Sequence, residues 1–385
     1  MTAAAALYVH LPWCVRKCPY CDFNSFERQT DLPQRAYVSA LLCDLDAELV
    51  ERPVAHLTSI FLGGGTPSLF SGESIATLLD GIAARCALDA DLEVTLEANP
   101  GTVEAGRFRD YIAAGVNRLS LGIQSFDSSM LARLGRIHDA DQARRAIALA
   151  RAAGVSNLNL DLMFGLPGAP ANHALVDLEQ AIAHAPEHIS WYQLTLEEGT
   201  HFARFPPALP DHDTICDDYE AGLMRLAAAG FEHYEVSAFA RPARQAAHNL
   251  NYWRFGDYIG IGAGAHGKRT RADGAVTRTV RVRHPERYMK LALEGAAVDE
   301  VSAVSGLSLA SEFMMNSLRL KHGFTLALFE ARTGLSPAAI ARPLRDGQAR
   351  GWLSCEGGAV RPTATGFRFL TDLQLLFMDL QSDAA

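Results

Sequence analysis

The chain has 385 residues, of which 49% are hydrophobic and 21% are charged, so it can bury a sizeable core and is not intrinsically disordered. This length predicts roughly two to three domains, or a (β/α) barrel with an appended domain. The net charge of −9 argues against a general nucleic-acid-binding protein, which would carry a basic excess, so we expect no nucleic acid among its partners.

No uninterrupted apolar run approaches the length of about 20 residues that a membrane-spanning helix needs. The first residues, MTAAAALYVHLPWC, carry no basic segment ahead of their apolar stretch and therefore do not resemble a secretory signal peptide. The sequence predicts a soluble, cytoplasmic protein with at most peripheral membrane contact.

Short β-rich runs alternate with helical patterns through the first half of the chain. The predicted strands cover 7–12, 59–65, 92–100, 118–125, 157–165 and 188–196, and the helices that follow them cover 33–51, 73–86, 103–113, 140–153, 172–184 and 213–229. This order indicates βαβ units and a parallel sheet. Polar residues or glycines lie at or just past the C-terminal end of every predicted strand, as in a barrel, whereas a doubly wound sheet would gather its site at one switch point. We therefore predict an α/β fold with a partial (β/α)6 barrel of the TIM type.

The regular alternation ends near residue 230. We expect one further strand over 231–240, a polar, aromatic loop at 248–253, and a hairpin over 271–284 with its turn at Asp273. From about residue 300 helices return, and a hairpin over 352–363 and a last helix over 365–380 complete a smaller C-terminal helical or winged domain. The predicted division is a barrel over 1–240, a connecting loop and hairpin region over 241–300, and the C-terminal domain over 301–385.

Three of the seven cysteines lie within eight positions, directly after the first predicted strand. Cys14, Cys18 and Cys21 can supply three thiolates from one loop, whereas the other four cysteines are scattered and are expected to be small buried hydrophobes. Three thiolates do not complete a four-thiolate zinc site, but His10 could be a fourth ligand, which leaves a zinc-stabilised binding protein as one interpretation. A [4Fe–4S] cluster normally takes four thiolates, so a cluster on three would leave one iron open to an exogenous ligand.

The segment CVRKCPYC, with LYVHLPWC overlapping its start and GGGTPS after the second strand, resembles the CxxxCxxC signature of the radical S-adenosylmethionine (SAM) superfamily. The resemblance implies a radical SAM barrel in which SAM chelates the open iron and is cleaved reductively to a 5′-deoxyadenosyl radical. Over residues 5–290 the motifs LEANP, GIQSF, LGRIH and NLDLMFGLPG are similar to those of the coproporphyrinogen dehydrogenase branch. That branch contains oxygen-independent coproporphyrinogen III oxidases and haem chaperones of the HemW type.

The resemblance also implies roles for individual residues. Cys14, Cys18 and Cys21 would hold the [4Fe–4S] cluster, and Tyr8 and Tyr20 would lie beside the bound SAM. Backbone and hydroxyl groups for the amino acid end of S-adenosyl-L-methionine would come from Gly64, Gly65 and Thr66, because glycine permits a close approach. The other matching positions, each of which could instead be a capping or salt-bridge residue, are Glu97, Gln124, Arg136 and Asp161.

Two departures distinguish the chain from the oxidases of this branch. The oxidase pattern has a fourth cysteine two residues after the third, where this chain has Phe23. The oxidases also extend further ahead of the first barrel strand, where only six residues precede Leu7. Both differences favour the haem chaperone type, without coproporphyrinogen oxidase activity and without catalytic residues of that reaction. Oxidative decarboxylation of coproporphyrinogen III propionates is the alternative function.

The chaperone resemblance implies haem as a third bound group, with haem-accepting proteins such as respiratory enzymes as partners and a homodimer as the expected assembly. HNLNYW (248–253) is similar to the HNxxYW motif of that group, which makes His248 a candidate haem ligand. The other interpretation of His248 is a loop histidine packed beside Tyr252 and Trp253.

The segment 268–287 carries one lysine and six arginines. Arg281 and Arg283 fall on one face of the predicted strand, and the expected arrangement is a solvated hairpin face. A docking patch for carboxylates, such as haem propionates, or for an acidic partner is the other interpretation.

Overall fold

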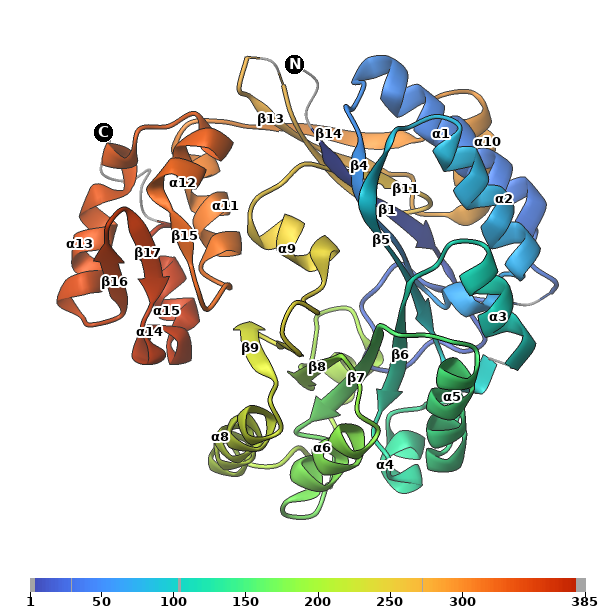
Figure 1. Ribbon diagram of the computed structural model, residues 1–385, viewed down its shortest axis with the longest axis horizontal. Coiled ribbons are helices and arrows are strands. Elements are labelled where there is room, and N and C mark those ends of the chain that lie inside the picture. Colours follow the sequence, from blue (N-terminus) through green and yellow to red (C-terminus); the bar gives the residue numbers. More distant parts are fainter. Residues whose placement is uncertain (1–3, 29, 103–104, 272, 379–385) are drawn as a thin grey trace.

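The computed structural model of the chain describes residues 4–28, 30–102, 105–271 and 273–378, and a curved sheet of 12 strands forms its main body (Figure 1). Six neighbouring strands of this sheet pair in parallel and in chain order: β1 (Ala5–Leu11), β4 (Leu57–Gly64), β5 (Leu88–Ala98), β6 (Arg118–Gln124), β7 (Leu158–Phe164) and β8 (His188–Gln193). These are the six predicted barrel strands, so the predicted (β/α) order is confirmed.

Helices cover the outer, convex side of the sheet (Figure 1). The long helices that connect successive strands are α1 (Gln34–Glu51), α2 (Gly72–Ala83), α3 (Ala105–Ala113), α5 (Ala140–Ala152), α6 (His173–Ala183) and α8 (His212–Ala228). Side-chain caps fix the start of three of them: Ser71 caps α2, Asp211 caps α8, and the Asp139 carboxylate accepts the Gln142 amide in a capping box ahead of α5. Apolar strand residues pack against these helices in one core, which contains Leu62, Leu96 and Leu160.

Additional strands extend both ends of the parallel sheet. β11 (Tyr258–Ile261) pairs in parallel with β1 on the side opposite β4, and three antiparallel strands follow it: β12 (His266–Thr270), β13 (Val276–Arg281) and β14 (Val298–Val304). At the other end lie β10 (Ala238–Ala240) and β9 (Glu232–Glu235). Within the described ranges the edge strands β14 and β9 do not pair with each other, so the barrel is partial.

Two segments differ from the prediction. The single strand expected over 231–240 is a hairpin of β9 and β10, because the chain reverses at 236–237 and β10 pairs antiparallel with β8. The loop expected at 248–253 is a helix, α9 (Ala247–Trp253), on the inner side of the sheet against β4. The predicted hairpin turn at Asp273 is present. The first strand of the hairpin, β12, ends at Thr270 and therefore lies ahead of the predicted range, and residue 272 lies outside the described ranges.

The C-terminal part combines helices with a three-stranded sheet around a separate core, which includes Phe313, Phe329 and Leu353 and also contains Phe255 and Val276 from the preceding region. The sequence predicted the helices and the hairpin over 352–363 but not the third strand. Its elements are α11 (Leu307–Ser317), β15 (Phe324–Thr325), α12 (Leu326–Thr333), α13 (Ala341–Ala349), β16 (Leu353–Glu356), β17 (Ala359–Pro362), α14 (Ala364–Arg368) and α15 (Leu370–Leu375). The helix expected over 365–380 is interrupted at Phe369. Residues 379 and 380, where it was expected to end, lie outside the described ranges, as do residues 381–385.

The remaining short elements lie in the connections. They are β2 (Trp13–Cys14), β3 (Phe26–Glu27), η1 (Pro67–Leu69), η2 (Pro100–Thr102), α4 (Ser128–Arg133), α7 (His201–Arg204), α10 (Pro285–Leu293) and η3 (Pro337–Ile340). Among the helices of the described ranges, none has the length and apolar character needed to cross a bilayer.

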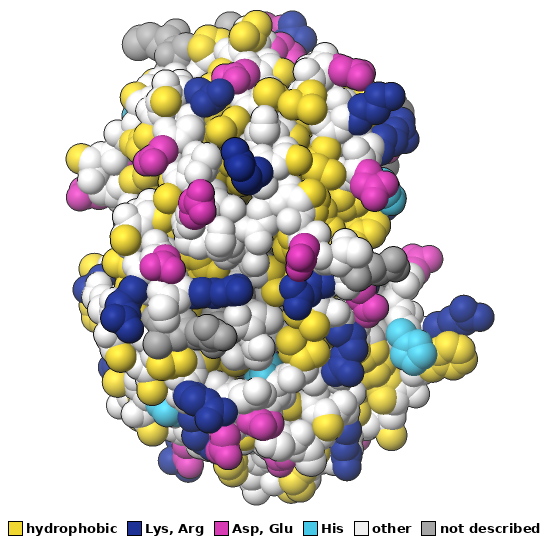
Figure 2. Space-filling view, turned by 90° about the vertical axis from the view of Figure 1, so that its right-hand side faces the viewer, with side chains coloured by type: hydrophobic (Ala, Val, Ile, Leu, Met, Phe, Trp, Pro, Cys, Tyr) yellow, Lys and Arg dark blue, Asp and Glu magenta, His cyan; other side chains and the backbone are white. Residues whose placement is uncertain are grey.

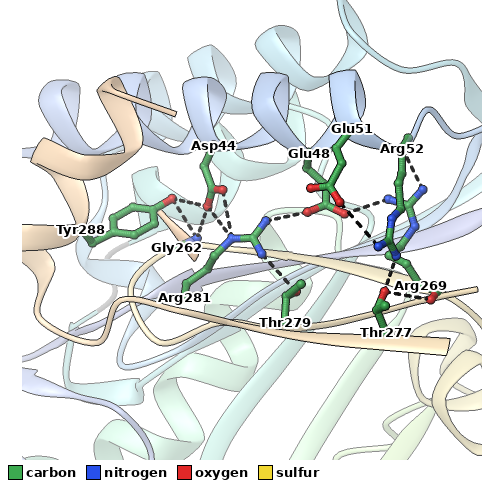
Figure 3. A network of polar contacts seen from close by, with 10 residues as sticks. All are labelled: Asp44, Glu48, Glu51, Arg52, Gly262, Arg269, Thr277, Thr279, Arg281 and Tyr288. Atoms are coloured by element: carbon green, nitrogen blue, oxygen red, sulfur yellow. Dashed lines mark hydrogen bonds and ion pairs between the residues drawn. The ribbon is translucent and has the colours of Figure 1, made fainter. Parts of the chain in front are cut away.

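The basic hairpin is not the solvated face that the sequence suggested (Figure 3). Arg281 is 1% exposed, and its guanidinium donates to Asp44 Oδ1 at 3.0 Å and to Glu48 Oε2 at 2.8 Å on α1. Arg269 is also buried and donates to Glu48 Oε1 at 3.0 Å, and the buried Lys268 pairs with Asp257. These cations therefore hold the hairpin against α1 and against Asp257, the residue before β11. Of the two arginines expected to share a face, only Arg283 is exposed.

Candidate functional site

The three clustered cysteines lie on the loop between β1 and α1. This loop is fixed at both ends by the short parallel pair β2–β3, in which Trp13 pairs with Phe26. The Cys21 amide donates to the Cys18 carbonyl at 3.1 Å, so the loop turns between the second and third cysteines. All three thiols are free and partly exposed, which leaves them available as ligands.

A cavity of about 300 Å³ opens beside this loop at the carboxyl ends of the parallel strands. Its wall includes eleven residues that the sequence singled out: Cys14, Cys18, Tyr20, Cys21, Gly64, Gly65, Thr66, Glu97, Gln124, Arg136 and Asp161. They come from the loop after β1, from the end of β4 and the loop after it, from the ends of β5 and β6, from the middle of β7, and from the turn after α4. Residues spread over 148 positions are thus brought together because parallel strands present their carboxyl ends on one side.

Two carboxylates face this cavity from neighbouring parts of the sheet. Glu97 Oε2 accepts the Gly64 amide at 3.2 Å, and Asp161 accepts the Ser120 hydroxyl and the Asn159 side-chain amide, both at 2.8 Å. Among the ion pairs of the described residues, none involves Glu97 or Asp161. Burial, with a contribution from the Asp161 charge, raises the pKa of Glu97 to about 8, and burial also raises the pKa of Asp161. Such a pair is suited to a cationic ligand that also carries hydroxyl groups.

Arg136 brings a positive charge to the cavity beside the cysteine loop. Arg136 Nη1 lies 3.6 Å from Cys18 Sγ, Nη2 donates to the Gly122 carbonyl at 2.9 Å, and the buried Nε has no hydrogen-bond partner in the described part of the chain. A guanidinium at this position favours thiolates and the carboxylate of a bound ligand. Gln124, at the end of β6, adopts a φ of 67° and accepts the Tyr192 hydroxyl at 2.9 Å, a strained conformation of the kind that collects at binding sites.

The glycine segment after β4 approaches the cysteine loop directly. The Gly65 and Thr66 amides donate to the carbonyls of Leu11 and Trp13, at 2.9 and 2.8 Å. A Cβ on Gly65 would lie 2.6 Å from the Trp13 carbonyl oxygen, so only glycine fits there. Because both amides are already bonded, as is that of Gly64, these residues can offer a ligand in the cavity carbonyl oxygens and the Thr66 hydroxyl, and not the amides.

Tyr8 and His248 do not line this cavity. The Tyr8 hydroxyl lies 2.9 Å from His10 Nδ1 and faces a second cavity beside the first. His248 is 1% exposed on α9, with Nδ1 2.9 Å from Ser59 Oγ and Nε2 3.0 Å from the Tyr252 hydroxyl. As folded, both ring nitrogens of His248 are engaged, and its role as a haem ligand stays a prediction.

Other lining residues were not singled out from the sequence, among them Ser120, Gly122, Arg16 and Tyr192. Ser120 and Gly122 alternate along β6 with the buried Leu119, Leu121 and Ile123 and lead to Gln124, so the period of two in RLSLGIQ could have placed them on the inner face. Arg16 and Tyr192 had no comparable signal. The Arg16 side chain donates to the carbonyls of Gly135 and Arg136, so it links the cysteine loop to the turn after α4.

The residues present fit an iron–sulfur cluster with a cationic organic ligand better than a single zinc ion. Within the described ranges no set of three or more His, Cys, Asp and Glu side chains converges on one metal ion. His10 is buried and both its ring nitrogens are taken, Nε2 by the Asn24 carbonyl at 2.8 Å, so it is not a free fourth ligand. Three thiols that do not converge, an unsatisfied guanidinium nitrogen and two unpaired carboxylates match a larger cluster and SAM.

Comparison with known proteins agrees with this geometry. The pattern of the Radical SAM superfamily matches residues 8–181, and that of the HemN C-terminal domain matches residues 304–369. Heme chaperone HemW of Escherichia coli is 49% identical over 97% of this chain and 98% of its own length. The mouse protein named Radical S-adenosyl methionine domain-containing protein 1, mitochondrial, is 40% identical over 83% of this chain and 74% of its own. The structure of Coproporphyrinogen III oxidase (HemN) from Escherichia coli has the same fold, with a TM-score of 0.82 at 21% identity over 98% of this chain and 90% of its own. The chain belongs to the HemW family within the radical SAM superfamily.

Proposed function

We propose that this protein is a haem chaperone that binds haem and delivers it to haem-requiring proteins such as respiratory enzymes. The observation that carries the proposal is the match over nearly the whole chain to several relatives named Heme chaperone HemW, at 36–49% identity. Phe23 supports it, because the chain lacks the extra cysteine of the oxidase pattern and has an aromatic side chain at the cavity wall instead.

Membership of the radical SAM superfamily implies a [4Fe–4S] cluster and SAM. We propose that Cys14, Cys18 and Cys21 hold the cluster, which supplies an iron open to an exogenous ligand. Arg136 then offsets negative charge at the thiolates, while Glu97 and Asp161 face the positively charged part of SAM and its ribose hydroxyls.

The proposal is tested with cluster-reconstituted protein under anaerobic conditions. Supplied with coproporphyrinogen III, SAM and a low-potential reductant, the protein is expected to form no decarboxylated product by mass spectrometry. Loaded with haem, it is expected to convert an apo-haemoprotein to the holo form. Stepwise loss of two carboxyl groups from the substrate at catalytic turnover would instead establish the oxidase.

SAM binding is expected to strengthen with pH, because Glu97 has a pKa of about 8 and only its ionised form attracts the cationic ligand. Calorimetric titration of SAM between about pH 7 and pH 9 should show affinity rising by about fivefold. In Glu97→Gln the part of the pH dependence that comes from Glu97 should vanish, and only the part that comes from titration of SAM itself should remain. Glu198→Gln, an exposed site, is the matched control and should keep the wild-type slope. An equal slope in Glu97→Gln would remove Glu97 from the SAM site.

The proposed partners are haem and haem-accepting proteins, with a homodimer as the assembly and peripheral membrane contact during delivery. On the face seen in Figure 2, basic and acidic side chains are interspersed and neither sign forms a continuous patch, which supports protein partners over nucleic acid. Light scattering of the holo-protein tests the dimer, and vesicle flotation tests the membrane contact.

A further inference from the structure

A second cavity, of about 420 Å³, lies on the inner side of the sheet between the cysteine loop, α9 and the β11–β12 connection. It adjoins the first cavity, because Phe23, Gly64 and Glu97 line both. Its other lining residues are Tyr8, His10, Asp22, Asn24, Tyr252, Tyr258, Gly264, His266 and Arg283.

The histidines around this cavity differ in whether their ring nitrogens are free. His10 is engaged by Tyr8 and Asn24, and His248, behind the wall, by Ser59 and Tyr252. His266 is exposed at the start of β12, and in the described part of the chain its ring makes no hydrogen bond or ion pair. Partial burial, followed by the charge of Arg283, lowers the pKa of His266, so the ring is neutral at physiological pH and has a free lone pair.

Arg283 supplies an unpaired cation to the same cavity. Its backbone is fixed, since the Arg283 carbonyl accepts the Asn24 side-chain amide at 2.9 Å, and its guanidinium has no ion-pair partner among the described residues. This sets it apart from its hairpin neighbours Lys268, Arg269 and Arg281, which are all buried and paired. A solvent-accessible guanidinium beside a cavity is suited to a carboxylate.

The remaining wall is aromatic. Phe23 is 58% exposed although it is a large apolar side chain, and the rings of Tyr252 and Tyr258 pack edge to face at 4.6 Å. Of the two acids, Glu97 has a raised pKa of about 8 and Asp22 is exposed to solvent. Flat aromatic surfaces, a free imidazole and a free guanidinium match the flat ring, the iron and the propionates of haem.

We propose that this second cavity is the haem site, with a ring nitrogen of His266 on the haem iron, Arg283 on a propionate and Phe23 against the porphyrin. The proposal rests on the proposed function and assigns its cargo a place. Haem held there adjoins the cluster and SAM cavity through Phe23, Gly64 and Glu97.

The test is a titration of the cluster-reconstituted, full-length protein with ferric haem, followed by difference absorbance and electron paramagnetic resonance. His266→Ala is expected to lose the imidazole-ligated signature and to bind haem about tenfold more weakly. Added imidazole should restore the signature. His322→Ala, in the exposed loop between α11 and β15, is the matched control, and His266→Gln serves if the alanine variant does not fold.

The Arg283 contact is tested with haem and with its dimethyl ester. Arg283→Gln should bind haem about fivefold more weakly than wild type does, with an unchanged spectrum, yet match wild type for the ester. Arg287→Gln, exposed on α10, should leave both affinities unchanged.

The outcomes separate the site from the function. If folded His266→Ala binds haem with the wild-type affinity and spectrum, or if only His248→Ala loses the signature, the site is overturned while the chaperone function stands. If wild-type protein binds no haem at all, the proposed function is overturned and the site with it.

Discussion

Replacing Cys18 with alanine is expected to abolish assembly of the iron–sulfur cluster and with it the binding of SAM. The described cavity offers three thiols from one loop, and removal of one leaves two, which cannot hold three irons of a [4Fe–4S] cluster. After anaerobic reconstitution, iron should fall from about four atoms per chain to less than about one, and the broad visible absorbance should disappear. Cys14→Ala and Cys21→Ala are expected to behave in the same way.

The matched control is Cys216→Ala on α8, which removes a thiol far along the chain from the cavity lining. It should retain the wild-type iron content, and circular dichroism should show that all the variants are folded. If Cys18→Ala kept four irons and Cys216→Ala lost them, the cluster would have to be held elsewhere.

The parallel half of the fold could be predicted because its signals are local. Each strand is a short apolar run with its own helix, and pairing in chain order needs no further information. α9 could not be predicted in the same way: AHNLNYW has no apolar period, and this helix depends on tertiary contacts such as that of His248 with Ser59 on β4. The reversal between β9 and β10 was missed for a similar reason, since β10 is defined by its pairing with β8.

The site could be predicted in outline because polar residues at the ends of parallel strands gather on one side. Glu97 and Gln124 line the cavity for that reason, whereas Asp161 lines it from the middle of β7. The sequence does not show which hydrogen bonds are already made inside the protein. Only the structure shows that the amides of Gly64 and Gly65 are used and that both ring nitrogens of His248 have partners.

The basic hairpin was interpreted wrongly because the acidic partners of its buried arginines, Arg269 and Arg281, are 221 or more positions away. Asp44 and Glu48 lie four residues apart on α1 and therefore on the same face of that helix, among buried apolar residues such as Leu41 and Leu45. A helix that buries two carboxylates requires cations opposite them, but the sequence does not reveal which cations.

Replacing Arg281 with methionine is expected to reduce the free energy of unfolding by about 3–5 kcal/mol, because it leaves two buried carboxylates without their shared cation. Arg281 bridges Asp44 and Glu48, and Asp44 is further held by the Tyr288 hydroxyl at 2.8 Å (Figure 3). Urea unfolding of wild type and variant in the same cluster state measures the difference. Arg287→Met, at an exposed position on α10, should stay within about 0.5 kcal/mol of wild type.

The loss of free energy of unfolding caused by Arg281→Met should also grow with pH. Burial raises the pKa of Asp44 in the folded protein, and Arg281 opposes that rise. Without Arg281 the folded protein holds the Asp44 proton more tightly still, so it binds more protons than the unfolded chain up to a higher pH. Since the free energy of unfolding falls with pH wherever the folded state binds more protons than the unfolded chain, the variant should weaken more than wild type as the pH rises above about 4, the ordinary pKa of an aspartate. A penalty that is constant or shrinks over this range would mean that Asp44 does not carry the uncompensated charge.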